Sequence, residues 1–147
     1  MISQDLQPGE ILLVEDRRSH QDLVLEAFEE RDIPHQVHIV NNGEEALDFL
    51  QRNKNYGYAP RPDLIVLDLD LPKMGGQELL AVLKANPDLK LIPVVIFSSS
   101  SATQDITNSY ALHANSYVTK PTELDQFFEA VQGIVDFWLN LAALPST

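Results

Sequence analysis

The sequence contains no cysteine among its 147 residues. Disulfide bridges, thiolate zinc sites and cysteine nucleophiles are therefore excluded. Basic residues are also scarce: 10 Lys and Arg stand against 22 Asp and Glu, which gives a net charge of −12 at pH 7. Because such a chain is repelled by phosphate backbones and by anionic lipid surfaces, we expect it to bind neither nucleic acid nor membranes.

Long hydrophobic runs are missing as well. No segment approaches the roughly 20 apolar residues of a transmembrane helix. The N-terminus also lacks the basic region and apolar stretch of a secretory signal peptide. We therefore expect a cytoplasmic protein. The composition, 44% hydrophobic and 22% charged, is globular, and the length suits about one domain.

Short apolar runs alternate with helical patterns along the chain. Uninterrupted apolar runs are typical of strands buried on both faces of a sheet, and they predict strands near residues 11–14, 64–67 and 93–97. Shorter, mixed segments predict two further strands near 37–40 and 116–118. Apolar residues at three- and four-residue spacing predict helices over 19–30, around 46–50, around 79–83, over 103–112 and over 123–141. Ser19 is the expected N-cap of the first helix, and residues 51–62 are the least regular stretch, expected to be a loop.

This five-fold alternation of strand and helix predicts an α/β fold. We expect an open, five-stranded parallel sheet, doubly wound with helices on both faces and joined by right-handed crossovers. A closed eight-fold barrel would need roughly 200 residues or more. We assign residues 1–10 to a polar N-terminal tail, 11–141 to the domain and 142–147 to a C-terminal tail.

Polar side chains follow the predicted strands where each strand ends. Open α/β sheets bind their ligands at this edge. Clustered carboxylates repel one another unless a cation such as Mg²⁺ or Mn²⁺ joins them. A hydroxyl and an ammonium group at the same edge would suit a phosphoryl group, which a carboxylate could attack. The candidates are Glu15, Asp16, Asp68, Ser98 and Lys120.

The order of these motifs resembles the receiver domain of two-component response regulators. The resemblance covers about residues 9–140 and implies a flavodoxin-like fold. The segments that carry it are ILLVED at 11–16, LIVLDLDLPKMGG at 64–76, PVVIFS at 93–98 and YVTKP at 117–121.

The resemblance implies a role for each acidic residue. Asp68 would be the phosphoacceptor. Asp16 and Asp68 would hold Mg²⁺, or Mn²⁺, directly, Glu15 largely through water, and Asp70 through its main-chain carbonyl. By the same resemblance, the protein accepts a phosphoryl group from a sensor histidine kinase and hydrolyses it slowly, so it is not a conventional enzyme.

The resemblance also assigns the residues that respond to phosphorylation. Ser98 takes the hydroxyl position, Lys120 would pair with the phosphoryl group, and Ser98 and Tyr117 would form the switch. Two positions depart from the common pattern: Gly75 stands where Asp is frequent, and His113 stands where Gly is usual. His tolerates the left-handed conformation better than most residues, so we expect the turn at His113 to survive.

A finer similarity is to the phytochrome-associated response regulators of cyanobacteria. It lies in Arg61-Pro62-Asp63, Leu112-His113 and Phe137-Trp138. It implies a phytochrome-like kinase as the partner. Since few residues follow the last predicted helix, we expect no output domain and signalling through protein contacts.

Other interpretations of single motifs stay open. Asp68-Leu69-Asp70 also occurs in haloacid-dehalogenase-like phosphatases, although Pro72 does not fit that family and the chain has no room for a cap domain. A receiver-like domain that is never phosphorylated would be expected to lack Asp68 or Lys120. His35 and His38 are spaced as metal ligands, but without a third ligand we expect ordinary surface histidines.

The last predicted helix carries two apolar stripes, of which only one can face its own sheet. Because an exposed second stripe usually marks a partner surface, we expect a homodimer through the face formed by the fourth helix, fifth strand and fifth helix. The stripe expected against the sheet is Leu124, Phe127, Phe128, Val131, Val135 and Trp138. The stripe expected at the dimer interface is Ile134, Phe137, Leu141 and Leu144.

Overall fold

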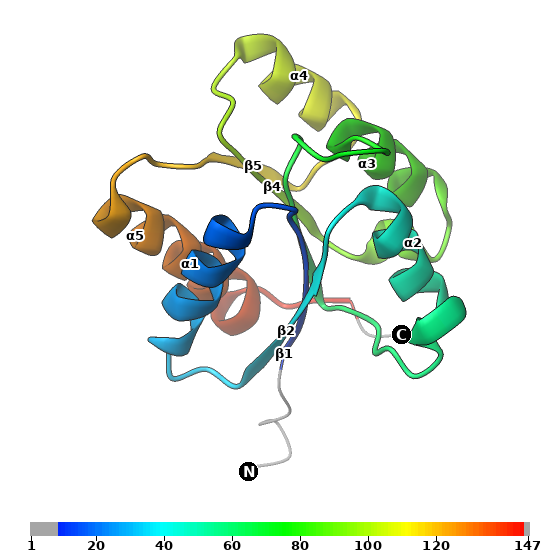
Figure 1. The fold of residues 1–147 in the computed structure, drawn as a ribbon, viewed down its shortest axis with the longest axis horizontal. Coiled ribbons are helices and arrows are strands. Elements are labelled where there is room, and N and C mark those ends of the chain that lie inside the picture. The colour runs from blue at the N-terminus through cyan, green and yellow to red at the C-terminus, as the bar shows by residue number, and fades with distance from the viewer. Residues whose placement is uncertain (1–8, 146–147) are drawn as a thin grey trace.

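The computed structural model describes residues 9–145, and it confirms the predicted α/β architecture. Five parallel strands form one sheet in the order β2-β1-β3-β4-β5 (Figure 1). This order makes β2 and β5 the edge strands. The strands are β1 (Gly9–Val14), β2 (His35–Val40), β3 (Leu64–Leu67), β4 (Val94–Ser98) and β5 (Ser116–Thr119).

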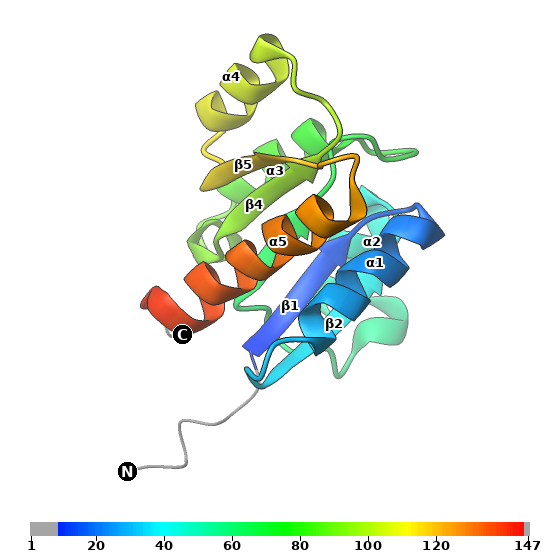
Figure 2. The same ribbon diagram turned by 90° about the vertical axis from the view of Figure 1, so that its left-hand side faces the viewer.

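Helices cover both faces of the sheet. In Figure 2, α1 and α5 lie side by side over one face, and α2, α3 and α4 lie on the other. No helix within residues 9–145 is long and apolar enough to cross a bilayer. The α-helices are α1 (Arg18–Glu29), α2 (Gly43–Gln51), α3 (Gly76–Ala85), α4 (Thr103–Ala111) and α5 (Leu124–Val135); shorter segments are η2 (Lys54–Tyr56), η3 (Leu89–Leu91) and the π-helical η4 (Asp136–Leu141).

Two hydrophobic cores flank the sheet, and each strand contributes to both. Successive side chains of a strand point to opposite faces. In β1, Leu12 and Val14 therefore pack under α2 and α3, while Ile11 and Leu13 pack under α1 and α5. These four side chains are at most 2% exposed. The double burial explains why the strand is apolar without alternation.

The sheet extends further toward the N-terminus than the apolar runs predict. Gly9 and Glu10, which the sequence assigns to the tail, are the first residues of β1. The Gly9 amide donates to the Pro34 carbonyl, and the Asp63 amide donates to the Glu10 carbonyl. Backbone hydrogen bonding thus continues past the apolar run. Residues 1–8 and 146–147 of the predicted tails lie outside the described residues.

Helix α1 begins one residue earlier than predicted. Arg17 occupies the N-cap position, and Ser19 is an exposed residue inside the helix, so the predicted Ser19 cap is wrong. The Arg17 amide donates to Glu15 Oε2 at 2.9 Å, and the Gln21 amide donates to the Arg17 carbonyl at 3.0 Å. The buried Glu15 therefore fixes the start of the helix from outside it.

The segments after α2 and after α4 both contain ordered turns. The stretch 51–62, expected to be irregular, contains the short 3₁₀ helix η2. His113 adopts a left-handed φ of 72°, and its amide donates to the Tyr110 carbonyl at 2.9 Å. The turn after α4 therefore forms without glycine.

The predicted stripes of the last helix need correction at three residues. Leu124 was expected against the sheet but is 56% exposed, whereas Ile134 was expected in the exposed stripe but is only 6% exposed and packs with Val131. Ile134 follows Val131 by three residues and therefore shares its face. Leu144 is half-buried and lines a small pocket with Ile92, near the residues at which β3 and β4 begin.

Of the second stripe, only Phe137 and Leu141 are exposed, at 48% and 75%. They lie in η4, where a π-helical turn holds more residues than an α-helical turn. Trp138, which the sequence places against the sheet, and Leu139 pack toward the core beneath α1 and α5. The three residues that depart from the predicted stripes lie outside this turn, since Leu124 and Ile134 belong to α5 and Leu144 follows η4.

Gly76 sets the turn between β3 and α3. Its amide donates to the Leu69 carbonyl at 3.1 Å. A Cβ at this position would lie 2.4 Å from the Asp68 carbonyl oxygen and 2.5 Å from Leu69 Cα. These contacts are with backbone, which cannot rotate away. The backbone of α3 thus approaches the end of β3 closely only because this residue is glycine.

We predict that Gly76→Ala destabilises the fold by about 1–3 kcal/mol, because the added methyl forces the β3–α3 turn apart. Gly75→Ala is the matched control, since a Cβ at Gly75 has no atom within 4 Å. Urea unfolding of both variants measures the difference. Equal stability of the two variants would contradict the close-approach explanation.

Candidate functional site

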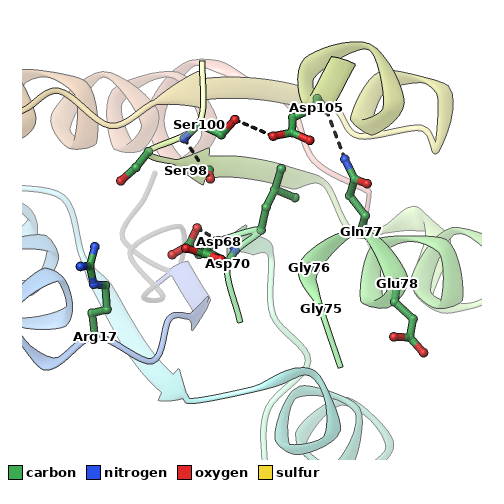
Figure 3. Close-up of a pocket in the computed structure, with 12 residues that line it drawn as sticks. Arg17, Asp68, Asp70, Gly75, Gly76, Gln77, Glu78, Ser98, Ser100 and Asp105 are labelled. Atoms are coloured by element: carbon green, nitrogen blue, oxygen red, sulfur yellow. Dashed lines mark hydrogen bonds between the residues drawn. The ribbon is translucent and has the colours of Figure 1, made fainter. Parts of the chain in front are cut away.

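The predicted site residues come together at one edge of the sheet. Glu15, Asp68, Ser98 and Lys120 are buried where β1, β3, β4 and β5 end, and Asp16 is exposed beside them. A pocket of about 440 Å³ opens above Asp68. Figure 3 shows its lining, which includes Asp68, Asp70, Gln77, Ser98, Ser100, Asp105 and Arg17.

Three carboxylates form a cluster beside this pocket. Glu15, Asp16 and Asp68 each offer one oxygen, and these oxygens lie within 4.8 Å of one another. Hard oxygen ligands suit Mg²⁺ and Mn²⁺. When ionised, the three carboxylates and the Lys120 ammonium among them carry an excess of two negative charges, which a divalent cation would balance. The residues present therefore fit Mg²⁺ or Mn²⁺.

Lys120 holds the cluster together from β5. Its Nζ donates to Glu15 Oε1 at 2.5 Å, to Asp68 Oδ2 at 3.2 Å and to His20 Nδ1 at 2.8 Å. The side chains of Lys120, Glu15 and Asp68 are each only 3% exposed. Buried charges persist only when they are paired and hydrogen-bonded. Lys120 thus lets two carboxylates remain inside the protein.

Glu15 is the most constrained of the acids. Besides the bond to Lys120, its Oε2 accepts the Arg17 amide at 2.9 Å. Burial raises the pKa of Glu15, and the hydrogen bonds from Lys120 and from the Arg17 backbone oppose that rise. Asp68 has a further donor in the Asp70 amide, at 3.2 Å from Oδ1.

His20 was not singled out from the sequence, although it contacts Lys120 directly. It lies in the first turn of α1. Burial lowers the pKa of the His20 imidazole, and the charge of Lys120 lowers it further. Helical spacing could not have identified His20, because Glu15 and Asp16 precede the N-cap Arg17 and lie outside α1.

Ser98 and Tyr117 lie on adjacent strands and meet at the loop after β4. Ser98 is buried, and its Oγ lies 3.5 Å from the Ser100 amide. The Tyr117 hydroxyl donates to the Ser100 carbonyl at 2.7 Å, and the Tyr117 amide donates to the Tyr110 hydroxyl at 3.1 Å. Burial raises the pKa of Tyr117. Tyr117 therefore connects β5 to both the loop above the pocket and α4.

The two histidines considered as metal ligands have other partners. His38 Nε2 lies 2.8 Å from Glu10 Oε1, and His35 Nδ1 lies 2.7 Å from the Ile33 carbonyl oxygen. Over residues 9–145, the cluster of Glu15, Asp16 and Asp68 is the only group with the geometry of a metal site.

The chain is similar in sequence and fold to known response regulators. It is 47% identical over 139 residues to response regulator Rcp1 of Synechocystis sp., covering 95% of each chain. It matches the crystal structure of the phosphorylated cyanobacterial phytochrome response regulator RcpA with a TM-score of 0.91 and 47% identity, covering 95% of this chain and 99% of that one. The Mn²⁺-bound form of Rcp1 gives a TM-score of 0.90 at 47% identity, covering 95% and 100%.

The family comparison covers most of the domain and settles the choice left open by the Asp-x-Asp motif. Residues 11–132 match the model of the response regulator receiver domain. These residues contain all three acids of the cluster, Ser98 and Lys120. The chain therefore belongs to the response regulator receiver domain family, whose members are phosphoacceptor signalling proteins rather than conventional enzymes.

Proposed function

We propose that this response regulator accepts a phosphoryl group on Asp68 from a phosphohistidine of a phytochrome-type sensor histidine kinase. The observation that carries the proposal is the pairing of Asp68 with Lys120 at 3.2 Å inside a metal-compatible cluster of acids. Asp68 also lines the pocket of about 440 Å³, so a donor could reach it from outside the sheet.

The chemistry follows from the groups around Asp68. A carboxylate oxygen of Asp68 attacks phosphorus, the phosphorus–nitrogen bond of the donor breaks, and the imidazole leaves with a proton. The product is an acyl phosphate, which water later hydrolyses to phosphate and the free carboxylate. Lys120 and the Ser98 hydroxyl stabilise the phosphoryl oxygens by charge and hydrogen bonding.

Glu15, Asp16 and Asp68, with the Asp70 main-chain carbonyl, would hold the divalent cation. When bound, the cation neutralises negative charge on the phosphoryl group. Asp16 is the exposed member of the acid cluster, so exchange with solvent takes place on its side. Glu15 is already bonded through both oxygens, which favours contact with the cation through water.

Switching would use Ser98 and Tyr117. Movement of Ser98 toward a phosphoryl group would disturb the loop that contains Ser100, whose carbonyl accepts the Tyr117 hydroxyl. Because Tyr117 also contacts Tyr110, the change would pass to α4 and the edge strand β5. A small displacement is sufficient if it selects between two packed arrangements.

The phytochrome-type kinase is proposed from the relatives. RcpA is a cyanobacterial phytochrome response regulator, and two bacteriophytochrome response regulators match this fold at 38% and 39% identity. Similarity at this level, over 95% of the chain, favours a kinase of the same class.

Homodimerisation through α4, β5 and α5 is a separate proposal. The edge strand β5 and α5 border an open groove of about 510 Å³, whose lining includes Val118, Ala130, Ile134, Phe137 and Trp138. Phe137 and Tyr110 are each 48% exposed at this face. A second copy would cover these apolar groups by two-fold pairing next to the Tyr117 switch.

We predict that Asp68→Asn abolishes phosphoryl transfer, because the amide cannot attack phosphorus as a carboxylate does. Labelled ATP, a phytochrome-type histidine kinase and Mg²⁺ provide the assay, and the label on wild type should be lost in base. Asp88→Asn is the control, since Asp88 is an exposed acid paired with Arg61. Label retained by Asp68→Asn would contradict the assignment.

For the metal, we predict that Asp16→Asn weakens Mg²⁺ or Mn²⁺ binding by more than about tenfold, because loss of a direct ligand should cost at least as much as loss of an outer contact. Titration calorimetry measures this, and beryllofluoride binding should disappear with chelator. Asp22→Asn removes an equal charge from an exposed position of α1. An effect of the same size in Asp22→Asn would reduce the result to general electrostatics.

For the dimer, we predict that Phe137→Asp combined with Leu141→Asp shifts the protein toward monomer, because two charges enter an apolar contact. Sedimentation with and without beryllofluoride measures the mass. Tyr58→Asp is the matched control, since Tyr58 is a fully exposed aromatic residue away from α5. Wild type that stays monomeric at high micromolar concentration in both states would exclude the interface.

A further inference from the structure

The ammonium group of Lys120 has three protons, and each has one acceptor. Two acceptors are the carboxylates of Glu15 and Asp68, and the third is the imidazole of His20, whose Nδ1 lies 2.8 Å from Nζ. The bond to His20 is shorter than the 3.2 Å bond to Asp68. His20 is therefore at least as close to the lysine as one of its two carboxylate partners.

The contact fixes the form of the imidazole. Lys120 has donors and no acceptor. Nδ1 of His20 must therefore accept, and the ring proton must be on Nε2. Because the Nδ1 lone pair is directed at the ammonium, His20 acts as a neutral anchor that adds no charge to the acid cluster.

Packing holds the imidazole in this orientation. The ring lies 5.9 Å from the ring of Phe127 on α5, and Phe127 in turn packs edge-on against Phe97 at 5.2 Å. Lys120 Nζ lies 5.8 Å from the Phe97 ring. The ring of His20 thus packs against α5 while its Nδ1 contacts the lysine, and 21% of the side chain stays exposed.

Another pocket, of about 360 Å³, borders both His20 and Lys120. It lies between the start of α1 and the β5–α5 loop, and His20, Lys120 and Phe127 all line it. Asp68 lines the other pocket and not this one. Without the imidazole, the third proton of Lys120 would face this cavity, and the long side chain could turn into it.

We propose that His20 is a positioning residue for phosphoryl transfer, which holds the Lys120 ammonium at the phosphoryl site through its neutral Nδ1. The inference rests on the proposed acceptor role of Asp68. When a phosphoryl group is on Asp68, Lys120 exchanges its 3.2 Å bond to Asp68 for a phosphoryl oxygen, while Glu15 and His20 keep Nζ in place. Such preorganisation spares the reaction the cost of ordering a flexible lysine.

The test compares two substitutions that differ in one acceptor. His20→Leu retains apolar packing on Phe127 and removes the acceptor, whereas His20→Asn retains an oxygen near the position of Nδ1. We expect His20→Leu to lower both the affinity for beryllofluoride with Mg²⁺ and the phosphorylation rate by phosphoramidate about tenfold. His20→Asn should recover most of the loss, and His38→Leu, in the middle of β2, should behave as wild type.

Two further measurements separate positioning from stability. In a Lys120→Gln background, His20→Leu should cause no additional loss, because the ammonium it anchors is absent. The ¹⁵N shift of His20 Nδ1 should be that of an unprotonated nitrogen in wild type and should move in Lys120→Gln. Urea unfolding of each variant shows whether activity follows stability instead.

The outcomes are distinct. If His20→Leu matches wild type, if His20→Asn loses as much as His20→Leu, or if Nδ1 is protonated in wild type, the anchoring role is overturned. If wild type itself is neither phosphorylated nor able to bind beryllofluoride, the proposed function fails. The Nδ1 measurement needs no phosphorylation, so it still decides whether His20 anchors Lys120.

Discussion

The buried bonds from Lys120 to Glu15 and Asp68 are the constraint on which the rest of the site depends. They join residues 105 and 52 positions apart in the chain. Removing one partner of such a buried pair leaves an uncompensated charge, which costs about 3–5 kcal/mol. The strand ends that carry these residues, β1, β3 and β5, must therefore stay in register with one another for the fold to tolerate the acids at all.

The same bonds leave part of the negative charge of the acid cluster unbalanced. The ammonium is matched to two carboxylates, and Asp16 adds a third acid at the surface, so the cluster keeps an excess of negative charge. A bound divalent cation would relieve this excess, and under the proposed function a phosphoryl group would then add negative charge beside Lys120. Under the proposed function, both events would act on the same interactions of Lys120 with Glu15 and Asp68.

The path from the site to the surface is short. The loop after β4 borders the pocket and accepts the Tyr117 hydroxyl through Ser100, and Tyr117 contacts Tyr110 on α4. On the other side of the edge strand β5, Phe137 and the adjoining groove leave apolar groups exposed. Under the proposed switch, a change at Tyr117 would occur on the edge strand that borders this groove.

The sequence by itself determined the architecture and most of the site. The apolar run 64–67 forms a strand that is buried on both faces of the sheet, as its composition predicts. A polar residue directly after such a strand lies at the carboxyl edge of the sheet. Only the tertiary structure decided the partners of His20 and the exposure of Ile134 and Leu144. His20 on α1 and Lys120 after β5 are 100 residues apart in the chain. Residue patterns describe local structure and do not predict a contact of that sequence separation. Ile134 is buried because it shares the inner face of α5 with Val131, and Leu144 is half-buried because the chain after η4 reaches Ile92 and Pro93 before β4.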